Sequence, residues 1–127
     1  MHDRAMRSPA SLAALLSATA MIACANPPPT PPGLPEIQAL ALADAGKRSG
    51  LAASALQVIS AEAVTWPDGA LGCPQPGMLY TQALVPGFLV RIRAGAEVLR
   101  YHAGSRGGPA FCPASMAKAP LAPDLRR

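Results

Sequence analysis

The residues of this chain that could do covalent chemistry are few and lie mostly in its second half. Cys73 and Cys112 could each supply a thiolate nucleophile, and His102 is the one histidine outside the N-terminal segment that could act as its base. A Cys73–His102 pair would make the protein a thiol enzyme or a redox protein, but a disulfide would consume the thiol. The state of the cysteines therefore decides whether this chemistry exists.

Other reactive arrangements have weaker support. A triad of Ser105, His102 and Asp68 can be written, but a serine three residues after the base lacks the strand-to-helix elbow that such nucleophiles use. The two cysteines and the histidine lack the paired spacing of structural zinc ligands. Gly107-Gly108 has no following lysine or helix to complete a phosphate loop. The sequence thus predicts no catalytic residue, no metal site and no cofactor.

Length and composition allow one small domain. The chain has 127 residues, and its hydrophobic fraction of 50% includes much alanine and only 4% aromatic residues, so the core must be modest. The formal net charge of +4 is small, and Arg91, Arg93 and Arg100 stand singly rather than in a basic stripe with aromatic residues. This pattern argues against nucleic-acid binding.

Residues 1–23 have the organisation of a signal peptide. Arg4 and Arg7 precede an apolar run over residues 10–23, which is shorter than the roughly 20 residues needed to span a bilayer. The run ends in Met21-Ile22-Ala23-Cys24, which resembles the lipobox of bacterial lipoproteins. The resemblance implies cleavage before Cys24, attachment of palmitate-type chains to that cysteine, and an address in the cell envelope.

The same resemblance makes Ala25 compatible with sorting to the outer membrane, facing the periplasm. The protein would then reach the membrane through its lipid alone, since no later segment is apolar and long enough to insert. The alternative is an ordinary secretory cleavage near Ala23 or Ala25, in which Cys24 is incidental. We favour the lipid-anchored interpretation.

Residues 24–35 contain a proline-rich tether. The run Pro27-Pro28-Pro29-Thr30-Pro31-Pro32 can form neither a helix nor a central strand. In the polyproline II form, which rises ~3.1 Å per residue, this segment would hold the domain roughly 30 Å from the membrane. Such runs are also ligands for aromatic-lined grooves. Beside a lipidation site we favour the spacer.

A short helix and a strand open the predicted domain, which spans residues 36–112; residues 113–127 are expected to form a flexible tail. The helix signals are a proline at its start, an acidic residue in its first turn, basic residues in its last turn and Gly50 at its end. Leu56–Trp66 is rich in β-branched residues, but its alternation slips near Ser60. We expect a strand with a bulge at that point.

Two further strands alternate cleanly. Residues 88–93 place Phe88, Val90 and Ile92 on the side of the core and both arginines on the other side. After a short turn, Leu99 and Tyr101 should point inward, while Arg100 and His102 point outward. The sequence therefore predicts a small single domain of the α+β class, with one helix packed across a three-stranded, mostly antiparallel sheet.

The long loop Trp66–Gln82 is the most individual segment of the chain. Its prolines stiffen the backbone, and its glycines permit turns that proline cannot make. Trp66 is expected to anchor the loop on the core, because tryptophan buries a large apolar area. In the oxidising compartment that the signal implies, Cys73 and Cys112 should form a disulfide, which would pin the loop to the segment after the last strand.

The loop begins with W-P-D-x-x-L-G-C-P at residues 66–74 and continues through Pro76-Gly77 and Tyr80. It resembles a recurring element of uncharacterised bacterial secreted and lipoprotein domains. The resemblance covers about residues 51–112 and includes the later Tyr101-His102. It implies membership of that family but no activity, since the family has no settled function.

Two classes of function fit these features. The leading hypothesis is a non-catalytic binding or structural module of the envelope. It would contact an envelope protein through the loop residues Asp68, Gln75, Met78, Leu79 and Tyr80. The outward arginines are either an extension of this surface or a solvated sheet face. Within this class, a helix followed by three strands is similar to PepSY-type domains, which implies a protease-inhibitor-like module. The second class is the cysteine-dependent enzyme or redox protein described above.

Overall fold

The computed structural model describes residues 32–123, and a single helix, α1 (Leu34–Ser49), opens this part of the chain. Pro35 lies in the first helical turn, where its missing amide donor has no intrahelical partner to lose. The helix ends at Gly50, whose backbone is left-handed (φ 72°) and whose N–H donates to the Gly46 carbonyl at 2.9 Å. The predicted helix is confirmed.

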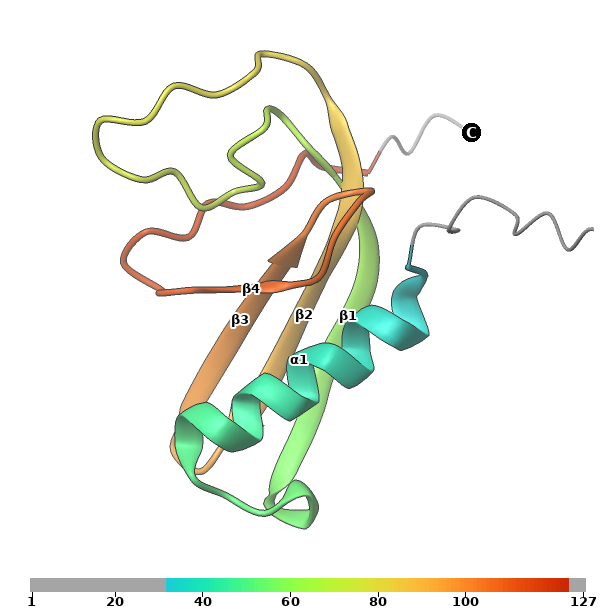
Figure 1. Cartoon of the computed structure of the whole chain (residues 1–127), viewed down its shortest axis with the longest axis vertical. Helices are drawn as coiled ribbons and strands as arrows, with labels where there is room; N and C mark the ends of the chain where they lie inside the picture. Colours follow the sequence, from blue (N-terminus) through green and yellow to red (C-terminus); the bar gives the residue numbers. More distant parts are fainter. Residues whose placement is uncertain (1–31, 124–127) are drawn as a thin grey trace, which may run out of the picture.

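A four-stranded antiparallel sheet follows a short 3-10 turn at Ala53–Ala55 (Figure 1). Its strands lie in chain order and are β1 (Leu56–Trp66), β2 (Val85–Ala94), β3 (Glu97–Ala103) and β4 (Ala110–Cys112). The α+β class and the single helix on an antiparallel sheet are confirmed, but the expected count of three strands is wrong. With three residues, β4 is too short to show alternation, and it forms by pairing Phe111 with Tyr101.

β1 contains the predicted irregularity. Its register against β2 shifts between Val58 and Ser60, so Ile59 is the extra residue. Before the shift Val58 pairs with Ile92, and after it Ala61 pairs with Val90. The bulge therefore keeps Leu56, Val58 and Ala61 on the side of the sheet that faces the helix.

The core lies between α1 and one face of the sheet (Figure 1). The helix contributes fully buried Ile37, Ala41 and Ala45, and small alanines allow it to lie close to the strands. The sheet contributes the predicted inward residues, which are Val90 and Ile92 of β2, Leu99 and Tyr101 of β3, and partly buried Phe88.

Tyr101 is the polar link between the sheet and the helix. Its hydroxyl donates to Asp44 Oδ2 at 2.8 Å. Burial, followed by this hydrogen bond to a carboxylate, raises the pKa of Tyr101 to about 12, and the same bond is the main cause that lowers the pKa of Asp44. The side chain of Arg48, which also bonds Asp44, lies over the Phe111 ring at 4.0 Å from its centroid.

The long loop and residues 113–123 lie at one end of the sheet (Figure 1), where the loop contacts the face opposite the helix. His102, expected to point outward, does project from this face, yet it is buried because the loop lies over it. Residues 113–123 were expected to be part of a flexible tail. Instead, the Lys118 N–H donates to the Gly72 carbonyl at 2.8 Å and the Leu121 N–H to the Thr65 carbonyl at 2.9 Å.

The predicted signal peptide, Cys24 and most of the tether lie outside the described residues, as do residues 124–127. Within residues 32–123, α1 is not long and apolar enough to cross a membrane.

Candidate functional site

The predicted disulfide joins Cys73 in the long loop to Cys112 at the end of β4. Their Cα atoms are 5.9 Å apart, and 39 residues separate them in sequence. Cys112 is fully buried and Cys73 is half-buried. The bond ties the middle of an irregular loop to the edge strand of the sheet, so the loop is held at both its ends and its centre.

Backbone hydrogen bonds close the base of this loop. The Gly69 N–H donates to the Thr81 carbonyl at 2.8 Å, which joins the two sides of the loop. Asp68, one of the predicted binding residues, uses its Oδ1 to accept the Ala70 N–H at 2.9 Å. An aspartate in this position stabilises a turn, so the structure gives Asp68 a local role in shaping the loop.

The loop tip is the segment 75–80, which contains the other four predicted binding residues. Tyr80 Oη accepts the Gln75 N–H at 2.8 Å, and the Met78 N–H donates to the Gln75 carbonyl at 3.3 Å. These bonds fold the tip on itself and direct two apolar side chains into solvent. Met78 is 59% exposed and Leu79 is 98% exposed. The tip therefore presents large apolar side chains on a braced backbone.

Trp66 is the anchor beneath the loop, as predicted. It is 0% exposed, its Nε1–H donates to the Ala103 carbonyl at 2.9 Å, and its ring stacks on His102 with centroids 4.6 Å apart. Gly72 and Gly87 lie against the indole, where a side chain would collide with it. The tryptophan thus packs the loop onto the sheet through contacts that only glycine permits.

His102 is a buried residue that helps to hold the loop against the sheet. It is 2% exposed, and its Nδ1 lies 2.6 Å from the Leu71 carbonyl oxygen, to which the neutral ring donates a proton. Burial is the largest cause that lowers the pKa of His102, with smaller contributions from the charges of Arg100 and Arg91. Both cysteine sulfurs are in the disulfide, so the structure does not assemble the Cys73–His102 nucleophile and base.

This histidine predicts a pH dependence of stability. The unfolded chain takes up a proton at His102 near pH 6.5, whereas the folded protein takes it up only at lower pH. Between these values the unfolded state binds more protons, so the free energy of unfolding should fall as pH drops below about 6.5. Urea unfolding at pH 8, 7, 6 and 5 would measure the fall. His102→Gln should flatten it; an unchanged slope in that variant would assign the effect to another group.

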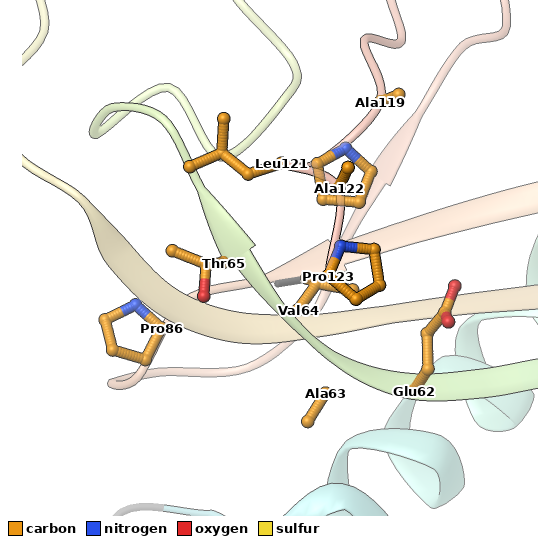
Figure 2. A pocket seen from close by; sticks show the side chains of 10 residues that line it. Glu62, Ala63, Val64, Thr65, Pro86, Ala119, Leu121, Ala122 and Pro123 are labelled. Carbon is orange, nitrogen blue, oxygen red and sulfur yellow. The ribbon is translucent and has the colours of Figure 1, made fainter. Parts of the chain in front are cut away.

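Two open hollows lie where residues 113–123 meet the rest of the domain. The larger, with a volume of about 710 Å³, runs along the end of β1 and is lined mainly by apolar side chains, among them Val64, Pro86 and Leu121 (Figure 2). Glu62 is its one ionisable lining residue. A smaller hollow of about 370 Å³ separates Pro74–Pro76 from Ser115, Met116 and Lys118. Neither hollow was predicted from the sequence, because one side of each is formed by residues 113–123, which were expected to belong to a flexible tail.

Within residues 32–123 no group of three or more histidine, cysteine, aspartate or glutamate side chains could hold a metal ion. Residues 38–112, more than half of the chain, match a protein family described as a domain of unknown function (DUF8738). No curated protein and no solved structure matches the chain.

Proposed function

We propose that this chain, which belongs to the DUF8738 family, is a non-catalytic binding module that is anchored in the cell envelope and contacts a partner protein through its loop tip. One observation carries the proposal: Leu79 is almost completely exposed, at 98%, on a loop held by a disulfide and by backbone hydrogen bonds. Moving an exposed leucine from solvent into a partner's apolar pocket lowers the free energy of the complex.

The bonds that hold the loop backbone in place support a role for the exposed Leu79 in binding. Association loses conformational entropy wherever it must order a flexible segment, and a segment ordered beforehand avoids that loss. In this loop the Gly69–Thr81 and Gln75–Tyr80 hydrogen bonds and the disulfide fix the backbone on either side of Leu79. Met78 widens the apolar contact with a side chain that adapts to irregular surfaces.

The anchor and address belong to the same proposal. The lipobox-like Met21–Cys24 supports acylation at Cys24, and the prolines of residues 24–35 support a spacer between lipid and domain. The Cys73–Cys112 disulfide agrees with an oxidising compartment such as the periplasm. We place the domain at the outer membrane, facing the periplasm.

A protease-inhibitor-like activity is the second candidate. Its specific support is the same loop, because inhibitors present an exposed segment on a backbone that bonds hold in place. Leu79 would then occupy a protease's specificity pocket. Incubation with envelope proteases would separate the candidates: an inhibitor slows the protease and stays intact at residues 75–80, whereas rapid cleavage there marks an ordinary substrate.

The main test uses a photo-crosslinking amino acid at position 78 in the full-length protein, expressed in a bacterium that processes lipoproteins. We expect one discrete protein adduct, and Leu79→Asp should lower its yield at least about tenfold, since a central apolar anchor contributes about 2 kcal/mol or more. Leu84→Asp is the matched control, because Leu84 is 64% exposed but lies outside the tip. Equal losses in both variants would indicate non-specific apolar association and contradict the proposal.

A further inference from the structure

A row of four residues crosses the sheet on the face opposite α1. Ser60 of β1 pairs with Arg91 of β2, Arg91 pairs with Arg100 of β3, and Arg100 pairs with Cys112 of β4. Val90 and Tyr101, the neighbours of the two arginines, face the helix side, so both arginines project from the other side. The row ends at the disulfide, next to the covered end of this face.

Arg91 and Arg100 are directly opposite one another on neighbouring strands, an arrangement in which like charges destabilise a sheet. Arg91 Nη1 donates to Ser60 Oγ at 3.3 Å, which leaves its charge uncompensated. Among residues 32–123, the one salt bridge joins Arg48 to Asp44 on the helix side. Glu62 lies on the same face of β1 as Ser60 but forms no ion pair with either arginine there.

The two arginines are also half-buried rather than fully solvated. Arg100 Nε is buried without a hydrogen-bond partner. Burial, followed by the charge of Arg91, lowers the pKa of the Arg100 guanidinium. Two like charges that are half-buried without a counter-ion destabilise a fold, so an anion bound against the exposed part of the pair would recover free energy.

We propose that Arg91 and Arg100 form a binding site for a single phosphate-type oxyanion. A guanidinium presents a planar fork of donors that matches the oxygens of phosphate, and two such forks on adjacent strands can hold one anion from both sides. The anion would supply the missing negative charge between the two arginines. This site lies on the sheet rather than at the loop tip, so it does not rest on the function proposed above.

The test is a titration of the folded full-length protein with inorganic phosphate, followed by NMR of the arginine Nε–H resonances and by thermal unfolding. We expect a saturable shift of the Arg100 resonance and a rise in Tm. Potassium chloride at the same ionic strength should produce neither. A chloride response equal to the phosphate response would overturn the proposal, because it would reflect screening of the arginine pair.

The variant Arg91→Gln distinguishes a specific phosphate site from general electrostatic attraction between anions and the protein surface. It should weaken phosphate binding at least about tenfold, since a hydrogen-bonded charged group is lost. In chloride alone it should melt at the same temperature as the parent protein or higher, because the cross-strand repulsion is gone. Arg91→Lys, which keeps the charge but not the fork, should also bind more weakly.

Arg106→Gln is the matched control, because this exposed arginine lies in the connection between β3 and β4. It should leave phosphate binding unchanged. Equal effects of Arg91→Gln and Arg106→Gln would overturn the site. So would binding to phosphatidylglycerol vesicles without any response to inorganic phosphate, since that result would show diffuse attraction to a charged surface.

Discussion

Replacing Gly72 with alanine is expected to destabilise the domain by about 2–5 kcal/mol, from a left-handed backbone and an overpacked contact. Gly72 has φ 71°, and an added Cβ would lie 2.8 Å from the Lys118 carbonyl oxygen and closer still to the Trp66 ring. The collision would push the loop off its anchor and disturb the Lys118–Gly72 hydrogen bond. Urea unfolding at pH 7.5 would measure the change.

Gly77→Ala is the matched control for this prediction. Gly77 also has a left-handed backbone, with φ 74°, but an added Cβ would meet nothing within 4 Å. Only the conformational cost of about 1–2 kcal/mol should therefore appear. Equal destabilisation by the two variants would mean that the packing of Gly72 against Trp66 contributes nothing, which would contradict the account of how the loop is seated.

Loss of the disulfide is expected to have an effect of similar size. The double variant Cys73→Ser/Cys112→Ser removes a crosslink between two residues 39 positions apart. In the chain-entropy description this removal lowers the free energy of unfolding by about 4 kcal/mol. This loss is comparable with the total stability of many small domains. We expect the variant to be largely unfolded or strongly destabilised at 37 °C, as measured by circular dichroism during thermal unfolding.

The reduced parent protein provides the control for the serine variant. Reduction removes the same crosslink without changing the sequence, so both should unfold over the same range of temperature. If the reduced protein keeps the stability of the oxidised protein, the loop is held by Trp66 and by its hydrogen bonds alone. The disulfide would then have no role in bracing the tip.

The parts of the fold that sequence predicted are those with a regular pattern. The alternation of Phe88, Val90 and Ile92 identified the face of β2 that packs against the helix, because side chains of a strand alternate between its two faces. The slip near Ser60 likewise predicted the bulge of β1. Alternation also assigned His102 to the face away from the helix, but it could not show that the loop covers this face.

The parts that sequence did not predict depend on backbone contacts across the chain. Residues 113–123 are held by hydrogen bonds from Lys118 and Leu121 to backbone carbonyls, and such bonds leave no residue pattern. The exposure of the loop tip was equally difficult to predict. An irregular segment has no hydrophobic periodicity, so the sequence does not show whether Leu79 is exposed or buried. Its residues were predicted, but their exposure required the structure.

The intact mass of the membrane-extracted protein after thiol alkylation, with and without prior reduction, would show whether the protein is a disulfide-closed, lipid-anchored module without thiol chemistry. We expect an acylated chain beginning at Cys24, in which Cys73 and Cys112 take up the alkylating reagent only after reduction. Alkylation of both cysteines without reduction would contradict the braced loop and reopen cysteine chemistry, and an unacylated mass would contradict the anchor.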